Sequence, residues 1–315
     1  MAFFLVTGGA GFIGSHLAQE LLRKNHRVRI IDNFSTGRRE NLNGFLHKLE
    51  LVEGDVRDSA AVKEAIGGVD YVLHQAALCS VWKSIDNPLE SNEVNVQGTL
   101  NLLVAARDAG VRRFVLASSS SVYGPARRLP KRELMKPNPI SPYAATKLAG
   151  EKYCQIFFHI YGLETVCLRY FNVFGPRQNP HSQYAAVIPT FILALLNHKS
   201  PTIYGDGEQS RDFTYVANAV QANILACLAR GIAGQVINIA CGVRHTLNAL
   251  VANLHNLIGV DLPAQNTAAR PGDVRHSLAD ISKAQRLLGY RPRVHFEDGL
   301  RRTVAWYKKE HTSDP

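Results

Sequence analysis

The chain has 315 residues, of which 46% are hydrophobic and 20% charged, a composition typical of a globular protein. No apolar run approaches the roughly 18 residues that a membrane-spanning helix needs, so we expect no membrane partner. The formal net charge is +10, but lysines and arginines are scattered in short groups. This distribution fits small anionic ligands, and we expect no nucleic-acid partner.

The N-terminal segment predicts a dinucleotide site. Phe3 to Thr7 is a predicted strand rather than a signal peptide, because it lacks a basic leader and a cleavage site. A glycine turn follows, then a helix over 15–22 and a strand over 27–31 that leads to Asp32. Glycines let the backbone approach a pyrophosphate at the helix N-terminus. Asp32 can accept hydrogen bonds from both adenosine ribose hydroxyls and would repel a 2′-phosphate, so we predict NAD rather than NADP.

Strands and helices alternate along the first half of the chain. Further strands are predicted at 49–52, 71–74, 114–117 and 165–170. Three further helices are predicted: a short one that ends near residue 66, and two longer ones over 92–109 and 143–161. This alternation predicts an α/β fold with a doubly wound parallel sheet and helices on both faces. Ligands of such sheets bind at the carboxyl ends of the strands, where the glycine turn and Asp32 stand.

The second half of the chain has a less regular pattern. Helices are predicted at 186–196, 216–228, 247–258 and 296–307, and short strands at 201–203 and 236–239. We therefore predict an NAD-binding Rossmann domain over 1–173 and a smaller mixed α/β substrate domain over 174–315. A segment near 207–233 is expected to pack back onto the first domain.

A serine cluster and a Tyr/Lys pair mark the candidate catalytic centre. Ser118 to Ser121 follow the strand at 114–117, and Tyr143 and Lys147 stand four residues apart on one predicted helix. Residues at i and i+4 share a helix face, so the ammonium can lie beside the phenol and lower its pKa from about 10. A Tyr-x-x-x-Lys pattern alone indicates an ordinary helical pair, and the glycine turn upstream favours the catalytic interpretation.

Further motifs follow one another in a fixed order. They are Thr7-Gly-Gly-Ala-Gly-Phe-Ile-Gly14, Asp32, Asp55-Val56, His74-Gln-Ala-Ala77, Asn95-Val-Gln-Gly98, the serine cluster, Tyr143 with Lys147, and Arg169-Tyr-Phe-Asn-Val-Phe-Gly175. Together they resemble the extended short-chain dehydrogenase/reductase family and, within it, the UDP-sugar 4-epimerases. The resemblance runs from residue 3 to about residue 307, and it implies tightly bound NAD and a UDP-sugar substrate.

The resemblance implies which residues surround the two ligands. Those around NAD are Gly8, Gly11, Phe12, Ile13, Gly14, Asp32, Asn33, Ser35, Thr36, Gly37, Asp55, Val56, Gln75, Ala76, Ala77, Asn95, Ser118, Tyr143, Lys147 and Tyr170. Those around the substrate are Ser119, Ser120, Ser121, Tyr143, Asn172, Ala186, Val187, Tyr204, Arg211, Arg275 and Ser277. Arg211 and Arg275, the latter in Gly272-Asp273-Val274-Arg275, suit a diphosphate because guanidinium binds phosphate oxygens bidentately.

The resemblance also implies a mechanism through a transient 4-keto sugar. Tyr143 as phenolate removes the C4 hydroxyl proton while hydride passes to the nicotinamide, and Lys147 binds the nicotinamide ribose. Ser119 relays the proton, with Ser120 and Ser121 as alternates. The 4-keto sugar then turns about its diphosphate link and takes the hydride back on its other face.

Two positions bear on which reaction and which sugar. Related 4,6-dehydratases carry an Asp-Glu pair where this chain has Ser121 and Val122, so dehydration lacks its acid and base. Ser277 falls where glucose-only epimerases carry a bulky Tyr, which favours UDP-GlcNAc and UDP-GalNAc over UDP-Glc and UDP-Gal. Cys79 is expected to line the same pocket. UDP-glucuronate 4-epimerase, decarboxylase and a dinucleotide-sensing scaffold stay open as alternatives.

Assembly and compartment follow from composition and from the resemblance. The five cysteines lack Cys-x-x-Cys spacing, which indicates reduced thiols in the cytoplasm, and no metal site is predicted. The helices at 92–109 and 143–161 carry apolar residues on more than one face, among them Leu102, Leu103, Val104, Ile156, Phe157 and Phe158. The family pairs these helices across a two-fold axis, so we expect a homodimer through a four-helix bundle.

Overall fold

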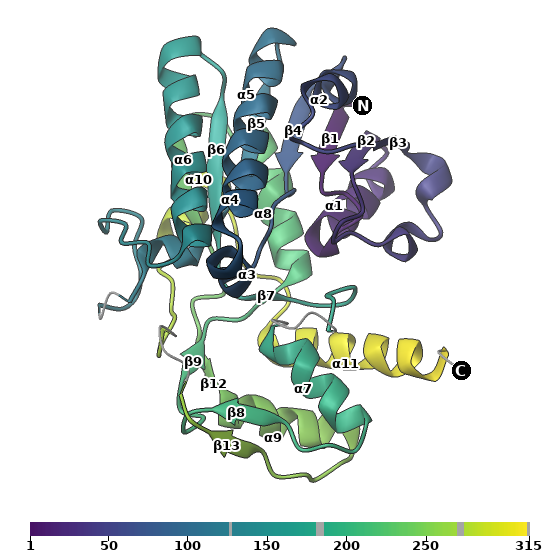
Figure 1. The fold of residues 1–315 in the computed structure, drawn as a ribbon, viewed down its shortest axis with the longest axis vertical. Helices are drawn as coiled ribbons and strands as arrows, with labels where there is room; N and C mark the ends of the chain where they lie inside the picture. The colour runs from purple at the N-terminus through teal and green to yellow at the C-terminus, as the bar shows by residue number, and fades with distance from the viewer. Residues whose placement is uncertain (126–127, 181–185, 270–273, 314–315) are drawn as a thin grey trace.

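A parallel sheet forms the centre of the molecule. The computed structural model describes residues 1–125, 128–180, 186–269 and 274–313, and within them this sheet has seven strands in the order β11-β6-β5-β4-β1-β2-β3 (Figure 1). The strands are β1 (Phe3–Thr7), β2 (Arg27–Asp32), β3 (Glu50–Glu53), β4 (Tyr71–His74), β5 (Arg113–Ser119), β6 (Thr165–Tyr170) and β11 (Gln235–Ile239). All neighbouring strands run parallel, which confirms the predicted doubly wound sheet.

Helices cover both faces of this sheet, as Figure 1 shows. They are α1 (Phe12–Arg23), α2 (Ser59–Ile66), α5 (Gly98–Asp108), α6 (Pro142–Tyr161) and α8 (Val216–Leu228). Because side chains alternate along a strand, Phe4 of β1 packs in one buried cluster with Leu17 of α1. Leu5, its neighbour, packs in a second cluster with Leu102 of α5. Burial on both faces explains why β1 is apolar along its length.

The helix predicted over 92–109 is interrupted in the structure. The chain forms α3 (Val81–Asp86), α4 (Pro88–Asn92) and a π-helical turn over Glu93–Gln97 before α5 begins. Within this wider turn, Asn95 accepts a hydrogen bond from the Leu78 N–H at 2.8 Å and donates one to the Leu78 carbonyl at 3.2 Å. Gly98 then lets α5 approach Val56, because an added Cβ would lie 2.6 Å from Val56 Cγ2.

A smaller mixed lobe follows β6. Its helices are α7 (Val187–Leu196), α9 (Leu247–Ile258), α10 (Ser282–Leu288) and α11 (Phe296–Ser313). Its short strands pair as β7 (Val173–Phe174) with β10 (Thr214–Tyr215), β9 (Ser210–Arg211) with β12 (His245–Thr246), and β8 (Thr202–Tyr204) with β13 (Gln265–Thr267). In Figure 1, α7, α9, β8 and β13 lie below the sheet. The sequence predicted the starts of α7, α9 and α11 to within one residue and missed α10 and β13.

The chain returns to the sheet after it has entered this lobe. α8, which overlaps the segment expected to pack back, contacts α1 and β5, and β11 extends the sheet beside β6. The division of the chain at residue 173 stays a prediction. None of the helices in the described part of the chain is long and apolar enough to cross a membrane.

Candidate active site

The glycine turn between β1 and α1 forms a cradle without side chains. A Cβ added to Gly14 would lie 2.1 Å from the carbonyl oxygen of Gly8, and one added to Gly8, whose φ is +64°, would lie 2.8 Å from the Ala76 nitrogen. The turn therefore tolerates only hydrogen at these positions. Because these glycines carry no side chain, the backbone of the turn and the N-terminus of α1 can closely approach the pyrophosphate of a dinucleotide.

Asp32 closes the far side of this cradle. Its carboxylate is buried and accepts hydrogen bonds from the Ala10 N–H at 2.9 Å and the Phe34 N–H at 2.8 Å. Burial raises the pKa of Asp32 above its ordinary value, and the two N–H groups oppose this rise. A carboxylate has about four lone-pair sites, so two stay available for ribose hydroxyls.

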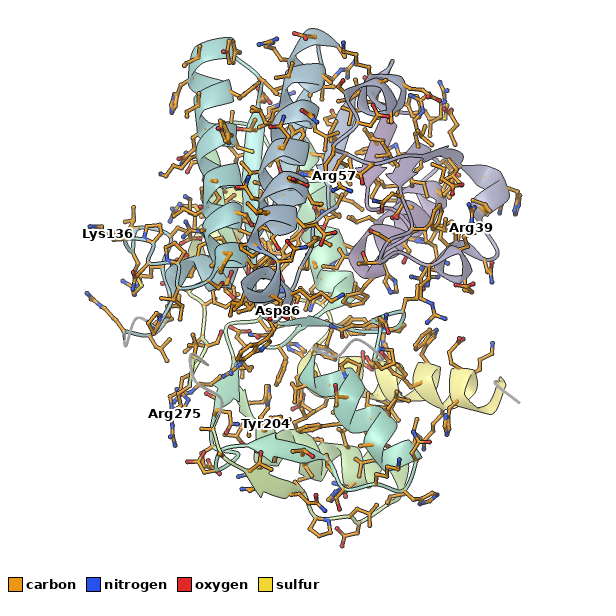
Figure 2. All side chains as sticks on the ribbon, viewed as in Figure 1. Arg39, Arg57, Asp86, Lys136, Tyr204 and Arg275 are labelled. Carbon is orange, nitrogen blue, oxygen red and sulfur yellow. The ribbon has the colours of Figure 1, made fainter. Side chains whose placement is uncertain are left out.

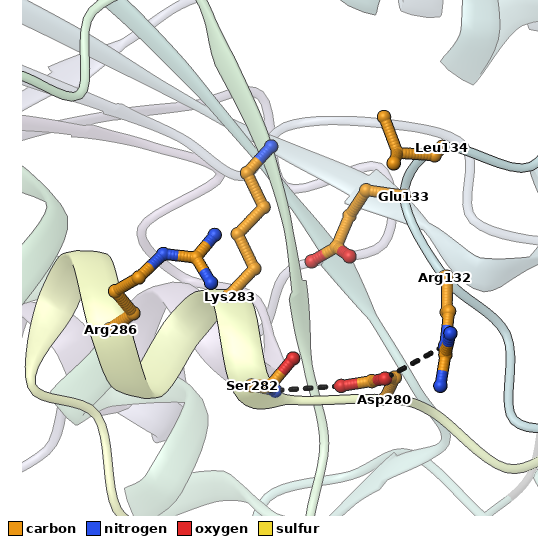
Figure 3. A pocket seen from close by; sticks show the side chains of 7 residues that line it. All are labelled: Arg132, Glu133, Leu134, Asp280, Ser282, Lys283 and Arg286. Carbon is orange, nitrogen blue, oxygen red and sulfur yellow. Dashed lines mark hydrogen bonds and ion pairs between the residues drawn. The ribbon is translucent and has the colours of Figure 1, made fainter.

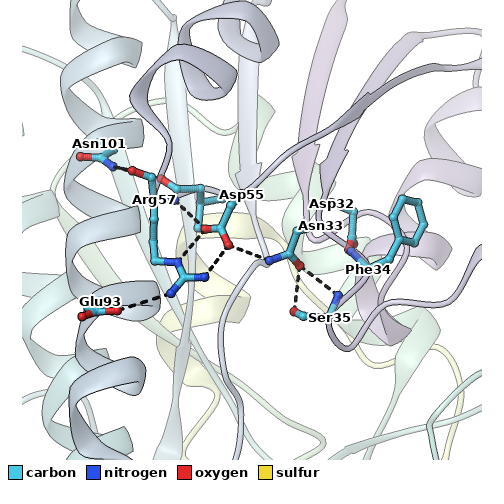
Figure 4. Close-up of polar contacts among 9 residues, drawn as sticks. Asp32, Asn33, Phe34, Ser35, Asp55, Arg57, Glu93 and Asn101 are labelled. Atoms are coloured by element: carbon cyan, nitrogen blue, oxygen red, sulfur yellow. Dashed lines mark hydrogen bonds and ion pairs between the residues drawn. The ribbon is translucent and has the colours of Figure 1, made fainter.

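Three further residues predicted to contact NAD lie together beside Asp32, as Figure 4 shows. Asn33 donates a hydrogen bond to Asp55 at 2.7 Å and accepts one from the Ser35 hydroxyl at 2.8 Å. Arg57, which the sequence analysis missed, also donates to Asp55 at 2.8 Å and lowers the pKa of that carboxyl to about 2. The Asp55 carboxylate is therefore ionised at neutral pH and fixed in orientation.

A buried chain of hydrogen bonds links β1 and β4 to the π-helical turn. His74 lies between Thr7 and Thr99, with Nδ1 2.7 Å from Thr7 Oγ1 and Nε2 2.9 Å from Thr99 Oγ1. Thr99 donates its proton to the Asn95 carbonyl, so it accepts from Nε2–H, and Thr7 donates to Nδ1. Burial lowers the pKa of His74 to about 3, which keeps the ring neutral. The sequence analysis named His74 only as part of a motif.

The same chain reaches the helix that carries the Tyr/Lys pair. The Asn95 side-chain amide donates to Thr146 Oγ1 at 3.1 Å, and Thr146 donates to the Tyr143 carbonyl at 2.8 Å. At the start of α6, Ser141 caps the helix by accepting from the Ala144 N–H at 3.2 Å, and Ser84 accepts from the Tyr143 N–H at 3.0 Å. These contacts fix where the first turn of α6 presents Tyr143.

Tyr143, Ser119 and Lys147 meet at the carboxyl end of β5. Ser119 and Cys79 both lie close enough to the Tyr143 hydroxyl to affect its pKa: Ser119 lowers it and Cys79 raises it. Lys147 donates to the Ala117 carbonyl at 2.9 Å, and its Nζ lies 5.9 Å from the Tyr143 ring centroid. Cys79 is exposed, as expected of a residue that borders an open cleft. The structure thus brings together the residues predicted for proton transfer.

The pKa of Tyr143 corrects one expectation. We expected Lys147 to lower it, but burial, together with the nearby Cys79, raises the pKa of Tyr143 well above its ordinary value. Burial also lowers the pKa of Lys147, since both side chains have lost water. A phenolate at this position therefore depends on positive charge from Lys147 and from any cationic ligand beside it.

The other serines of the cluster differ in their partners. Ser121 donates a hydrogen bond to Ser119 Oγ at 2.9 Å, so it helps to fix the orientation of the Ser119 hydroxyl. Ser118 donates to Glu151 at 2.5 Å, and Glu151 in turn forms a buried ion pair with Arg169 at 2.7 Å. The Ser118 side chain is therefore committed to the interior between β5, β6 and α6.

A cavity of about 210 Å³ gathers four of the eleven residues predicted around the substrate. Its lining includes Asn172, Ala186, Val187 and Arg211. Asn172, with a positive φ of 37°, donates to the Asp212 carbonyl at 3.1 Å and to Ser277 Oγ at 3.4 Å. Ser277 is thus hydrogen-bonded to a residue that lines this cavity, which we call the Asn172 pocket, but does not line it itself.

Tyr204 and Arg275 do not line the Asn172 pocket. Arg275 donates to Asp206 at 2.6 Å, and Figure 2 shows it near the edge of the lower lobe. The Tyr204 side chain is 39% exposed. Two residues of the motif around Arg275, Gly272 and Asp273, lie outside the described residues.

A buried carboxylate fixes the segment that carries Ser277. Asp212 accepts hydrogen bonds from the N–H groups of Ala279 at 3.1 Å, Cys241 at 2.9 Å and Gly242 at 3.0 Å. Burial raises the pKa of Asp212 to about 6. Asp212, next to the predicted Arg211, thus joins three segments of the lobe.

The chain is similar to known proteins over nearly its whole length. Residues 4–240 match the NAD dependent epimerase/dehydratase family. UDP-N-acetylglucosamine 4-epimerase from Methanobrevibacter ruminantium is 44% identical with a TM-score of 0.94, covering 98% of this chain and 99% of that one. UDP-glucose 4-epimerase from Thermotoga maritima is 37% identical with a TM-score of 0.94 and the same coverage.

A third solved structure resembles the chain and contains NAD. It is UDP-glucuronic acid 4-epimerase from Bacillus cereus in complex with UDP-glucuronic acid and NAD, at 33% identity and a TM-score of 0.91, covering 98% of this chain and 99% of that one. Three similar structures thus carry three different sugars in their names. The chain belongs to the NAD dependent epimerase/dehydratase family of extended short-chain dehydrogenases/reductases, and its cofactor is NAD.

Proposed function

We propose that the protein inverts C4 of UDP-sugars and prefers UDP-GlcNAc and UDP-GalNAc, with UDP-Glc and UDP-Gal as secondary substrates. The observation that carries this proposal is the meeting of Tyr143, Ser119 and Lys147 at the carboxyl end of β5. The choice of sugar rests on Ser277, which accepts a hydrogen bond from Asn172 of the pocket. The family and the three similar 4-epimerases support the reaction type.

The residues divide the work of the reaction among them. Bound NAD supplies an acceptor for the C4 hydride and returns it, so no external oxidant is needed. Tyr143 takes the proton of the 4-hydroxyl as general base and later gives it back. Ser119, which lies beside the Tyr143 hydroxyl, binds the same sugar oxygen and relays the proton. Lys147 offers the positive charge that a buried phenolate needs.

We assign the ligands to the two sides of the cleft by chemistry. The glycine turn, Asp32 and the Asp55 group suit the pyrophosphate, ribose and adenine of NAD. The Asn172 pocket and Arg211 suit the nucleotide end of the substrate, which brings an apolar base and a diphosphate. Arg275 would join them by leaving Asp206, to which it is bound in the structure.

The size of one side chain supports the choice of sugar. Ser277 accepts a hydrogen bond from Asn172 and is small, so it leaves room for an acetamido group at C2. The UDP-N-acetylglucosamine 4-epimerase from M. ruminantium, at 44% identity, is consistent with this preference. A uronic acid would need a cation at C6. Because the chain resembles the UDP-glucuronic acid 4-epimerase from B. cereus, epimerisation of UDP-glucuronate is the second candidate reaction. Decarboxylation of UDP-glucuronate is kept beside it.

Replacing Ser277 with Tyr tests the sugar preference. The added ring would occupy the space of the acetamido group, so kcat/KM for UDP-GlcNAc and UDP-GalNAc should fall while activity on UDP-Glc and UDP-Gal stays or rises. Steady-state assays without added NAD measure both pairs in both proteins, with UDP-glucuronate as a further substrate. An unchanged ratio between the pairs removes Ser277 from the specificity argument. The matched control is Ser277→Ala, which adds no bulk and should preserve the preference.

We further propose a cytoplasmic homodimer. All five cysteines are free, and three of them are buried, which agrees with a reducing compartment. On α6, Ile156 and Ile160 are 44% and 68% exposed and share one helix face. Such an apolar face is suited to a second copy of the chain.

A further inference from the structure

The structure contains a second cavity, larger than the Asn172 pocket and separate from it. Its volume is about 390 Å³, and it lies between the segment around Glu133 and the start of α10 (Figure 3). None of the residues that line it lines the Asn172 pocket. At about 30 Å³ per water, it has room for roughly a dozen waters or a ligand of similar size.

One side of this cavity carries positive charge. Lys283 and Arg286 stand three residues apart on α10, on one helix face, and Figure 3 shows both side chains on the same side of the cavity. Lys283 is half-buried and donates to the Val236 carbonyl at 2.7 Å, which leaves two of its three N–H groups. Within the described residues, neither cation has a carboxylate oxygen within ion-pair distance.

The environment of Lys283 is also unfavourable for a lone cation. Burial lowers its pKa, Glu133 raises it, and the nearby Arg169 and Arg286 lower it further. Arg169 is itself paired with Glu151, so the repulsion that a ligand could relieve is the one between Lys283 and Arg286. An anion placed between Lys283 and Arg286 would relieve this repulsion and satisfy their free donors.

The opposite side of the cavity accepts hydrogen bonds. Glu133 accepts from the Asn238 N–H through one carboxylate oxygen at 2.9 Å, and Figure 3 shows the carboxylate between α10 and Arg132. Asp280 is neutralised by Arg132 at 3.0 Å and accepts from the Ser282 N–H at 2.9 Å. Among the described residues, no donor is found for the second oxygen of Glu133. The Ser282 hydroxyl lies against Asp280 and can still accept a hydrogen bond, so both groups are suited to hydroxyl groups of a ligand.

A structural role accounts for part of this arrangement only. β11 is the outermost strand of the sheet, and its free edge is covered by Lys283 on the Val236 carbonyl and Glu133 on the Asn238 N–H. Arg286 contributes nothing to that edge. Its presence beside Lys283, over a cavity of this size, points to a ligand.

We propose that this cavity binds a small phosphate monoester of a sugar. The phosphate would lie between Lys283 and Arg286, and the sugar hydroxyls would reach Glu133 and Ser282. A bare phosphate would satisfy only the positive side of the cavity, and a neutral sugar only the other. The ligand therefore needs both parts, and it occupies a site apart from the cleft that binds NAD.

Isothermal titration calorimetry on the NAD-loaded protein tests this proposal. Glucose 6-phosphate should bind at one site per chain, inorganic phosphate at least tenfold more weakly, and glucose not measurably. Lys283→Gln and Arg286→Gln should each weaken glucose 6-phosphate about tenfold or more, because each removes a charged hydrogen bond. Glu133→Gln should weaken glucose 6-phosphate but not inorganic phosphate.

Two control variants locate the binding. Lys63→Gln removes an exposed lysine of α2, at the other edge of the sheet, and should leave the affinity unchanged. Arg211→Gln alters the Asn172 pocket and should also leave it unchanged. Circular dichroism checks that each variant is folded. No hydrogen bond joins Arg286 to β11 among the described residues, so its variant tests the site even if Lys283→Gln unfolds. Absence of binding, binding that Arg286→Gln leaves intact, or equal affinity for phosphate and glucose 6-phosphate would overturn the proposal.

Discussion

Tyr143 is the residue on which the proposed chemistry depends, and its surroundings set two opposing demands. Burial and Cys79 favour its protonated form, whereas proton abstraction needs the phenolate. Lys147 is close enough to favour the phenolate, and its ammonium is held by the Ala117 carbonyl at 2.9 Å. The site is thus arranged so that the base forms only when enough positive charge is present.

Replacing Tyr143 with Phe should lower kcat by about 100 to 10,000-fold, the range typical of a lost general base. The ring and its packing stay, so folding and the bound NAD should be unaffected. Turnover of UDP-GlcNAc and the NAD released on denaturation measure the two effects. The control is Tyr161→Phe on the same helix, where the ring is 50% exposed. Near-normal turnover of the Tyr143 variant would show that another group is the base.

At the scale of single residues, the sequence predicted which residues form the site better than it predicted their pKa values and their partners. Asp32 could be named because it stands at the end of the strand that follows the glycine turn, and Tyr143 and Lys147 because they stand four residues apart on one helix. The raised pKa of Tyr143 could not be predicted from the sequence, because it depends on how deeply the folded chain buries the phenol. Nor could the pairing of Arg275 with Asp206, residues that are distant in sequence and meet only in the folded lobe.

Among the elements, the turn between β1 and α1 is the most sharply constrained. Gly14→Ala would put a methyl group 2.1 Å from the Gly8 carbonyl oxygen, so the turn must open. We expect this variant to lose bound NAD while retaining most of its helical structure, as absorbance of released cofactor and circular dichroism would show. Gly67→Ala is the control, because its added Cβ would have no neighbour closer than 3.6 Å. Full NAD content in Gly14→Ala would contradict the assignment of the cradle.

The buried pair between α6 and β6 should matter for stability. Glu151 and Arg169 are 2% and 3% exposed, and Glu151→Gln would leave the arginine charge without its carboxylate. Removing one partner of a buried ion pair typically costs about 3–5 kcal/mol of unfolding free energy. Urea denaturation measures this loss. Lys152→Gln, its exposed neighbour on α6, should change the unfolding free energy by less than about 0.5 kcal/mol.

The elements that the sequence missed lack a hydrophobic pattern of their own. β13 is exposed at all three residues and is a strand only because it pairs with β8. The predicted helix over 92–109 failed at its start because Asn95 bonds to Leu78, a contact that no local pattern records. The core strands were predicted well, since burial on both faces makes them continuously apolar.

For the whole molecule, the expected dimer rests on fewer residues than the sequence suggested. Leu102, Leu103 and Phe157 are buried within the chain itself, so they say nothing about a partner. The exposed Ile156 and Ile160 on α6 carry the argument instead.

Light scattering at micromolar concentration should give twice the mass of the chain. Ile160→Glu should shift the protein toward the monomer, because it places a charge in the apolar face that the partner would cover. Leu134→Glu is the matched control, since Leu134 is 99% exposed on a loop and is not part of the apolar face formed by Ile156 and Ile160, so its replacement should leave the mass unchanged. A monomeric mass for the unaltered protein would refute the dimer.

β11 is synthesised long after β6, the strand beside which it lies, and this order has a consequence during synthesis. β6 ends at Tyr170, and its outer neighbour begins only at Gln235. A ribosome adding about 5–20 residues per second leaves the outer edge of β6 unpaired for roughly 3–13 seconds. During that interval the nascent chain presents a bare apolar strand that can pair with other chains. Protection of this edge, by a chaperone or by slow emergence from the ribosome, is therefore part of what the fold requires of the cell.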